Sequence, residues 1–333
     1  SKLYKIIFFN SMIMGTLISI SSYSWMGMWM GLEINLLSII PLFNSSKNMY
    51  SSESSLKYFL TQALASLILL FSITMLLMST EFIMPSMNSS LVLMMNSALL
   101  TKLGTAPFHF WFAEVMEGLN WSNCLILLTW QKIAPMILLM NNPLNMKLMI
   151  TVIIISLITS SIMSMNQTSL RKILTFSSIN HIAWMLSASL SSFNSWCLYF
   201  IIYTFTSVVI IMILNLFKSF HINQMINLNM KKTLKISFML NFLSLGGLPP
   251  FLGFLPKWMV IMEMINQNQL LLTLILILFT LIMLFVYTRL IYSSMIISHN
   301  ENKKMNQKLK TTNISIMNFL SLSSLILCPM ILT

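Results

Sequence analysis

Five side chains that can gain or lose a proton lie inside long apolar segments of this sequence: Glu33, Lys102, Lys132, His181 and Lys257. A charged side chain in the middle of a bilayer costs about 2.5–3.5 kcal/mol on insertion scales, so such a residue needs a partner or a function. Carboxylates, amines and imidazoles all accept and release protons. The chemistry that these residues predict is the transfer of protons or cations across a membrane.

Glu33 and Lys102 are predicted to act as a pair. Glu33 lies near the middle of the segment MWMGLEINLL, and Lys102 precedes a break at Gly104–Pro107 in LLTKLGTAPFHFW. At the end of a half-helix, the negative end of the helix dipole favours the charged amine. Because each charge stabilises the other, a change in their separation can bind or release a proton. A permanent ion pair that serves packing is the alternative.

Lys132 and Lys257 are the other two amines. Lys132 is the central residue of its segment, in TWQKIAP, where burial disfavours the charged form and lets the amine pass a proton on. Lys257 follows Pro256, and proline favours the first position of a helix, so we expect this lysine at the positive end of a half-helix. The alternatives are that Lys132 reaches lumen water without titrating and that Lys257 snorkels to the surface.

His181 lies in FSSINHIAWM, after Ser177, Ser178 and Asn180. Histidine can shuttle a proton near neutral pH, and the preceding hydroxyl groups could hold a chain of water molecules. The alternative is a buried neutral imidazole whose hydrogen bonds serve only the structure.

The composition predicts a membrane protein. Of the 333 residues, 57% are apolar and 8% are charged, and the mean hydropathy is +0.83. A soluble domain averages about 25% charged residues. The net charge of +12 comes from lysines in short loops, without a basic face interleaved with aromatic residues, so nucleic acid is not an expected partner.

No cofactor motif is present in the sequence. It contains no G-x-G-x-x-G and no P-loop. Cys124, Cys197 and Cys328 lie singly in apolar segments without metal-ligand spacing, so we expect small buried hydrophobic residues rather than ligands. With no cofactor or metal of its own, the chain would have to draw on an ion gradient or on coupled partners for uphill transport.

Eleven apolar segments are long enough to cross a bilayer, and lipid forces each to satisfy its own backbone as a helix. The predicted fold class is all-α, a polytopic membrane protein in which residues 1–333 form a single membrane domain. The predicted spans are 3–22, 25–44, 57–79, 91–113, 122–140, 147–165, 168–188, 194–217, 236–262, 269–294 and 313–331.

Basic residues in the predicted loops indicate the orientation. Fourteen lie on the side of the N-terminus and only Lys147 lies opposite, so the N-terminus should face the positive-inside compartment and the C-terminus the other. Arg289, near the inner end of its span, is expected to snorkel. Glu114 and Glu117 fall in an inner connection, where they should be solvated or bind a neighbouring subunit.

Two of the predicted spans are interrupted by the same G-x-x-P-F pattern, at Gly104–Phe108 and at Gly247–Phe251, 143 residues apart. They are the fourth and ninth spans, so residues 3–140 and 147–294 are predicted to be two five-helix repeats. A repeat of five helices crosses the membrane an odd number of times, so the second repeat would start from the opposite side and be inverted. Residues 313–331 would form an additional C-terminal helix. Interrupted helices in matching halves point to a transport site.

Four segments, WMGLEINLLSIIP, LLTKLGTAPFHFWFAEV, LLTWQKIAP and GGLPPFLGFLPKW, closely resemble the chain 2 family of NADH–ubiquinone oxidoreductase of animal mitochondria, an antiporter-like subunit of respiratory complex I. The resemblance covers nearly the whole chain and is weakest in the loops and the last span. It implies two inverted repeats, each with a broken helix, and a polar axis along the membrane midplane.

Carried over by motif, Glu33 and Lys102 resemble the family's coupling pair. Lys132 resembles its central proton-carrying lysine, and Lys257 resembles the lysine on the second broken helix. His181 falls on the stretch between the half-channels. Bacterial relatives have three more helices at the start, and their absence here implies a surface that partners or lipid must cover.

The resemblance also implies the setting. The partners would be chain 4, chain 4L, a lateral helix of chain 5, accessory subunits and membrane lipids. NADH, flavin, iron–sulfur clusters and ubiquinone are expected in partner subunits and none in this chain. The location would be the mitochondrial inner membrane, with the N-terminus toward the matrix and the C-terminus toward the intermembrane space. A stand-alone cation/proton antiporter and a scaffold subunit without a proton path are the alternatives.

Overall fold

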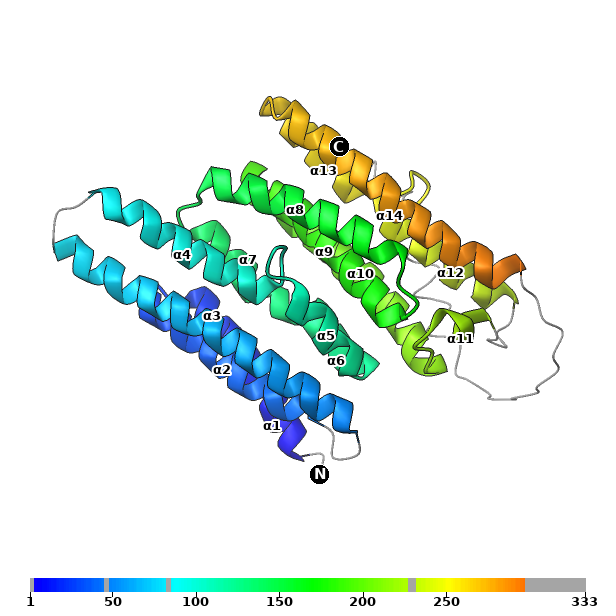
Figure 1. Cartoon of the computed structure of the whole chain (residues 1–333), viewed down its shortest axis with the longest axis horizontal. Helices are drawn as coiled ribbons and strands as arrows, with labels where there is room; N and C mark the ends of the chain where they lie inside the picture. Colours follow the sequence, from blue (N-terminus) through cyan, green and yellow to red (C-terminus); the bar gives the residue numbers. More distant parts are fainter. Residues whose placement is uncertain (1–2, 45–47, 82–84, 227–231, 297–333) are drawn as a thin grey trace. The chain divides into compact units, whose positions relative to one another are not determined.

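The computed structural model describes residues 3–44, 48–81, 85–226 and 232–296. Helices make up the regular structure of these residues, together with one isolated β-bridge between Ser169 and His221 (Figure 1). The helices are α1 (Leu3–Ser21), α2 (Trp25–Phe43), α3 (Met49–Glu81), α4 (Pro85–Leu103), α5 (Phe110–Gly118), α6 (Trp121–Leu128), α7 (Trp130–Asn141), α8 (Met146–Met165), α9 (Leu170–Ser191), α10 (Phe193–Phe217), α11 (Ile222–Ile226), α12 (Lys232–Gly246), α13 (Phe254–Asn266) and α14 (Leu270–Ile296).

Eight segments of the described residues are long and apolar enough to cross a membrane. Ser89–Leu103 is a shorter apolar helix. These segments agree with the prediction of a multi-pass, all-helical membrane protein. The last predicted span, 313–331, lies outside the described residues, as does Cys328.

Two helices differ from the predicted spans. The helix predicted at 57–79 begins at Met49, because serine hydroxyls in this polar stretch donate to carbonyls three residues earlier, as Ser51 does to Asn48 at 2.6 Å. The span predicted at 122–140 is divided at Thr129 into α6 and α7. Thr129 has φ −111° and ψ −69°, and its hydroxyl donates to the Leu125 carbonyl at 2.7 Å.

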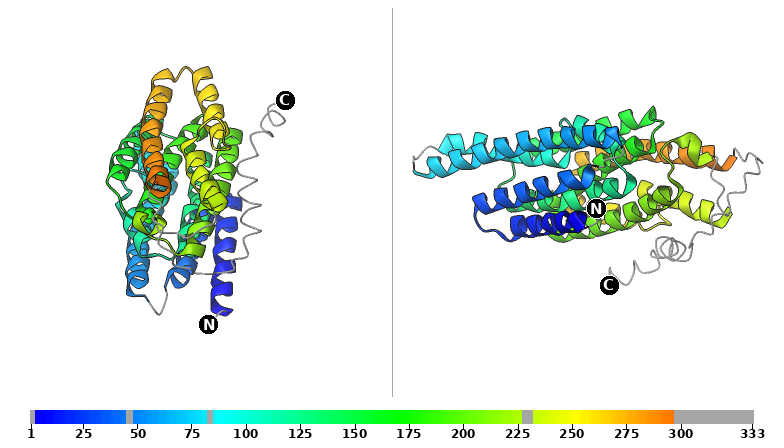
Figure 2. Two further views of the ribbon diagram at one scale, coloured as in Figure 1. Left: turned by 90° about the vertical axis from the view of Figure 1, so that its right-hand side faces the viewer. Right: turned by 90° about the horizontal axis from the view of Figure 1, so that it is seen from below.

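The chain divides into two compact units, residues 1–152 and 153–333. In the first unit, α1 packs along α2 and α3 packs along α4 (Figure 1 and Figure 2). Helix α7 contacts α1, α4 and α6, and α5 contacts α3. Both halves of the first broken helix, α4 and α5, are therefore held by α3.

In the second unit α9 contacts α10, α13 and α14. It is the least apolar of the candidate spans, with a mean hydropathy of 1.2, and also the most buried, at 89%. A helix that turns polar side chains inward must satisfy them with protein partners, since lipid offers none. The polar face of α9 is therefore where a functional site is expected in this unit.

Gly253, at the start of α13, provides a test of the second helix break. A Cβ atom built on Gly253 would lie 1.7 Å from the Ser244 carbonyl oxygen, so the backbone would have to move. We predict that Gly253→Ala lowers the stability of the subunit by about 1–3 kcal/mol, as overpacking does. The measurement is the thermal melting temperature of the assembled membrane complex.

Gly246→Ala is the matched control, because its Cβ would meet only side-chain atoms at 3.5 Å or more. It should melt near the wild-type temperature. Equal melting temperatures for both variants would contradict the close approach of α13 to α12.

Candidate proton-transfer sites

The two predicted helix breaks share one backbone geometry. Gly104 has φ +74° and Gly247 has φ +79°, a left-handed conformation that glycine adopts without a steric penalty. The next N–H group donates to the carbonyl five residues earlier, Thr105 to Leu100 at 3.3 Å and Leu248 to Leu243 at 3.4 Å. This is the hydrogen bond of a Schellman C-cap, and it ends α4 and α12 in the same way.

Lys102 lies in the last turn of α4 with 8% of its surface exposed. It lines a cavity of about 20 Å³ within the first unit, which is enough for a water molecule. The other lining residues come from α2, α3 and α7: Leu32, Asn35, Leu36, Tyr58, Gln62, Gln131 and Pro135. The amine therefore faces a polar, water-sized space below the helix break.

A network of uncharged polar groups borders this cavity. The Asn35 and Gln131 amides bind each other twice, with N–H···O distances of 3.0 and 2.9 Å. The Tyr58 hydroxyl donates to the same Gln131 oxygen at 3.2 Å, and the Gln62 amide donates to the Lys102 carbonyl at 3.4 Å. The network joins α2, α3, α4 and α7.

The sequence analysis did not identify this network. Two sequence features could have indicated it: Tyr58 and Gln62 are polar residues four apart in an apolar helix, and Gln131 directly precedes Lys132. The pairing itself depends on which helices are neighbours, which the sequence does not give.

Glu33 is half-buried on α2 and close enough to Lys102 to interact electrostatically. No ion pair within 4.0 Å joins the two in the described part of the chain. The structure thus brings the predicted partners into one neighbourhood and leaves a gap between their charged groups.

Lys132 is 2% exposed and lies in the first turn of α7, directly after the division at Thr129. Lys132 lies at the centre of the apolar span Trp121–Asn141, as predicted, and Thr129 interrupts the helix just before it. The amine nitrogen lies 5.9 Å from the centre of the Phe112 ring of α5. Its neighbour Gln131 lines the Lys102 cavity.

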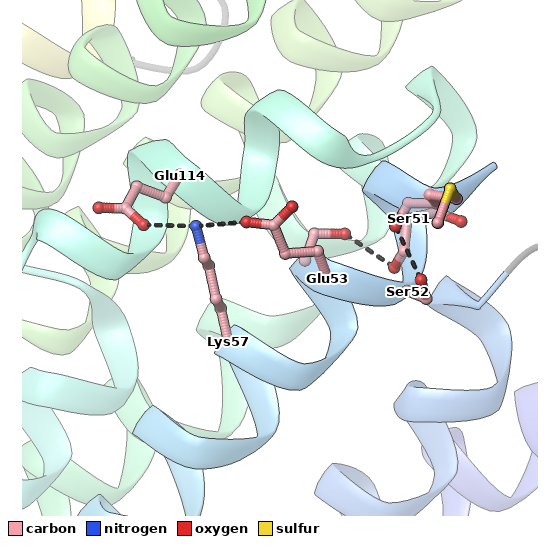
Figure 3. Close-up of polar contacts among 7 residues, drawn as sticks. Ser51, Ser52, Glu53, Lys57 and Glu114 are labelled. Carbon is pink, nitrogen blue, oxygen red and sulfur yellow. Dashed lines mark hydrogen bonds and ion pairs between the residues drawn. The ribbon is translucent and has the colours of Figure 1, made fainter.

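Glu114 is exposed, as expected for a solvated residue, and it also forms an ion pair within the chain. Lys57 of α3 binds both Glu53, at 3.0 Å, and Glu114 of α5, at 2.9 Å (Figure 3). All three side chains are partly exposed, so the energy of these pairs is small. Together, Lys57 and Gln62 connect α3 to both halves of the first broken helix.

Lys257 is 6% exposed, and its amine donates to the Leu245 carbonyl at 3.3 Å and the Gly246 carbonyl at 2.8 Å. One detail of the prediction is wrong. Pro256 is the third residue of α13 rather than the first, because the helix begins at Phe254. The amine binds α12 instead of snorkelling, which was the alternative, because the terminal carbonyls of α12 lack helical partners and attract a cation.

Arg289 also binds a helix end. Its guanidinium group donates to the carbonyls of Met165 and Gln167, where α8 ends. The same need of unpaired carbonyls for a donor explains these contacts.

His181 is 7% exposed, and its Nδ1 atom lies 2.9 Å from the Tyr199 hydroxyl. The Tyr203 ring centre lies 5.0 Å from the imidazole centre. Ser177 and Ser178, expected to hold water, donate to backbone carbonyls of α9, and their oxygens lie beside the hydroxyls of Tyr287 and Tyr203. The sequence analysis missed all three tyrosines, although Tyr199 and Tyr203 are spaced four apart and so share one face of α10.

The candidate residues therefore fall into two groups. Glu33, Lys102 and Lys132 belong to the first unit, and His181 and Lys257 belong to the second. Cys124 is buried and Cys197 is half-buried. Among the described residues, no group of three or more His, Cys, Asp or Glu residues could hold a metal ion.

Comparison with known proteins identifies the family. A family model described as NADH:quinone oxidoreductase/Mrp antiporter, TM, matches residues 22–284. NADH-ubiquinone oxidoreductase chain 2 of Anopheles gambiae is 50% identical over 336 residues, which cover 99% of this chain and 98% of that protein. This chain belongs to the NADH-ubiquinone oxidoreductase chain 2 family. The predicted resemblance is thereby confirmed.

Solved structures show the fold of the chain 2 family in other settings. A chain of respiratory complex I from Thermus thermophilus with bound Aureothin superposes with a TM-score of 0.88 at 20% identity, covering 99% of this chain and 79% of that chain. A chain of the Mrp complex from Dietzia sp. DQ12-45-1b superposes with a TM-score of 0.74 at 14% identity, covering 87% and 60%. At such identities the likeness concerns the fold alone.

The Asn35–Gln131 pair gives a prediction for the first site. We expect Gln131→Met to destabilise the subunit by about 1–3 kcal/mol, because it leaves the buried Asn35 amide and Tyr58 hydroxyl without their partner. Asn35→Leu should have a similar cost. The double variant should cost less than the sum of the two, since no amide is then left unpaired.

The melting temperature of the assembled complex measures all three variants. Additive losses in the double variant would contradict the direct pairing of the two amides.

Proposed function

We propose that this chain is a proton-translocating, antiporter-like core subunit of respiratory NADH:ubiquinone oxidoreductase. The observation that carries the proposal is the burial of three lysines at interruptions of apolar helices, in a chain 50% identical to a chain 2 protein over nearly its whole length. The chain is part of an enzyme, a translocase, without a redox site of its own. NADH, flavin, iron–sulfur clusters and ubiquinone belong to partner subunits.

The proton path runs through Glu33, Lys102, Lys132, His181 and Lys257. Glu33 controls how strongly Lys102 binds its proton, because a carboxylate that crosses the gap and approaches the amine stabilises the charged form. Lys132 takes the proton in a setting where burial favours the neutral amine. His181 and Lys257 carry it onward, and redox chemistry elsewhere in the complex drives the cycle.

The proposed architecture has eleven membrane helices. Residues 3–140 and 147–294 form two inverted five-helix repeats, and 313–331 adds a C-terminal helix. The matching Schellman caps after α4 and α12 support the repeats, because they fall at the same place in the two G-x-x-P-F patterns. Paired broken helices of this kind bind the transported ion in many transporters.

A stand-alone cation/proton antiporter is the second candidate, favoured by the family model that also covers Mrp antiporters. The purified chain in vesicles would then exchange cations for protons, whereas a complex I subunit alone should not. A scaffold subunit is the third candidate. It would gain nothing from the insertion cost of three buried lysines.

We place the chain in the mitochondrial inner membrane, with the N-terminus in the matrix and the C-terminus in the intermembrane space. Its partners are chain 4, chain 4L, the lateral helix of chain 5, accessory subunits and membrane lipids. The charge bias of the loops supports this orientation, because basic loops remain on the positive-inside face.

The orientation predicts labelling from opposite sides. A cysteine at Asn223 should react with a membrane-impermeant thiol reagent from the matrix side, and a cysteine at Lys147 only from the other side. Both native residues are exposed. Sealed vesicles of each orientation separate the two outcomes, and labelling of both sites from one side would refute the span count.

Lys132 provides the test of proton transfer. Arginine keeps its charge at every physiological pH, and methionine has none, so neither can alternate between protonated and neutral forms. We expect Lys132→Arg and Lys132→Met each to slow NADH-driven proton uptake about tenfold or more. Proton uptake by vesicles is normalised to the amount of assembled complex.

A lysine that only supplies positive charge would tolerate arginine better than methionine. Near-normal pumping by Lys132→Arg would therefore end the assignment of Lys132 as a proton carrier.

A further inference from the structure

Three tyrosines meet the buried polar face of α9. Tyr199 and Tyr203 come from α10, and Tyr287 comes from α14. Their exposed fractions are 1%, 4% and 1%. A buried phenol has to find a hydrogen-bond partner, and all three find theirs on α9.

Each tyrosine has a different partner. Ser178 lies beside the Tyr203 hydroxyl and Ser177 beside that of Tyr287. Both serines donate to backbone carbonyls of α9, at 2.7 and 2.8 Å, so each has a lone pair left for a neighbouring hydroxyl. Tyr199 instead contacts the imidazole of His181, which can itself change protonation.

We propose that Tyr199 is a further proton-carrying residue of the pumping reaction, which exchanges protons directly with His181. The inference rests on the proposed function of the chain, since His181 must lie on the path. Ser177 and Ser178 are positioning residues that fix the neighbouring phenols around the imidazole.

Proton transfer from His181 through Tyr199 does not require the phenol to become a charged phenolate. When the Nδ1–H bond of His181 breaks, a new O–H bond forms on the Tyr199 oxygen. The hydroxyl proton already on Tyr199 passes at the same time to a water molecule on the other side of the phenol, where a new O–H bond forms. Tyr199 is neutral before and after the step, and one proton has moved from the imidazole to the far side of the phenol. Reorientation of the hydroxyl group resets the pair.

Tyr287 continues the cluster toward Lys257. The hydroxyl of Tyr287 interacts electrostatically with that of Tyr199. Its ring edge lies 3.5 Å from where a Cβ atom of Gly246 would stand, and the Gly246 carbonyl accepts the amine of Lys257.

Trp184 lies between Tyr199 and Lys257. Its ring stacks on Tyr199 with centres 6.4 Å apart, and the amine of Lys257 lies 5.8 Å from its centre. The indole N–H group is a donor only and cannot relay a proton. In the proposed path, the hydroxyl groups of the three tyrosines therefore carry the proton around Trp184.

Tyr199→Phe tests the assignment, because it removes the hydroxyl group and keeps the ring that stacks on Trp184. The assembled complex in sealed vesicles is assayed for NADH-driven proton uptake in H₂O and in D₂O, normalised to the amount of complex. We expect uptake to slow about tenfold, the scale of a lost proton-transfer group, and the solvent isotope effect to rise. Tyr292→Phe, at an exposed tyrosine of α14, is the matched control and should behave as wild type.

The outcomes are distinct. Normal uptake in Tyr199→Phe with slow uptake in His181→Phe would overturn the role of Tyr199 and leave the proposed function intact. Normal uptake in both variants would refute the proposed path itself. Slow uptake without a larger isotope effect would also overturn the role, because a packing defect slows turnover without making proton transfer limiting.

Discussion

The carbonyl groups left unpaired where a membrane helix ends or breaks are the constraint on which the rest of this structure depends. Lipid supplies no donors, so each such carbonyl must find one in the protein. The Schellman bonds satisfy part of this need, and side chains satisfy the rest. Lys257 binds the end of α12, Trp111 donates to the Thr101 carbonyl at 3.1 Å, and Arg289 binds the end of α8. Basic side chains therefore lie at helix ends and breaks, and two of the proposed proton carriers, Lys102 and Lys257, are among them.

In the second unit, a whole helix, α9, has polar groups that need partners in the protein. Helix α9 is buried although its hydropathy is the lowest of the candidate spans, so the apolar stretches around it cover polar groups rather than a plain hydrophobic core. Its serines donate to its own carbonyls, and their oxygens lie beside the phenols of α10 and α14. On the same helix, the imidazole of His181 lies 2.9 Å from the Tyr199 hydroxyl.

Much of this organisation could be predicted from the sequence. The apolar runs 3–22 and 25–44 correspond closely to α1 and α2, and the glycine–proline patterns mark both broken helices. The interruption at Thr129 could not be predicted, because a threonine hydroxyl that bonds to its own helix, as Thr129 does, also occurs in the uninterrupted helices α3 and α8. Lys257 was assigned to α13, on which it lies. Its amine reaches α12 only because the chain folds back between the two half-helices.

The polar partners of the ionisable groups were missed for a further reason. An amide or a phenol in an apolar helix has the same sequence signature whether it binds a neighbour or faces lipid headgroups. Only the meeting of α7 with α2 and α3 gives Gln131 its partners, and only the packing of α9 against α10 gives Tyr199 its partner. Charged residues are different, since their insertion cost alone marks them.

The two sites share one electrostatic design. Amides and hydroxyls surround the groups that titrate, and these surrounding groups stay neutral throughout. Moving a proton therefore changes the charge of one side chain at a time, and the cost of that charge in a medium of low dielectric constant is met by fixed dipoles rather than by a second ion. In the proposed mechanism, a tight ion pair between Glu33 and Lys102 would hold the proton on the amine, whereas the gap between them would let the amine release it when the carboxylate moves away. The proposed role of this pair therefore depends on the distance between the two charges rather than on their number.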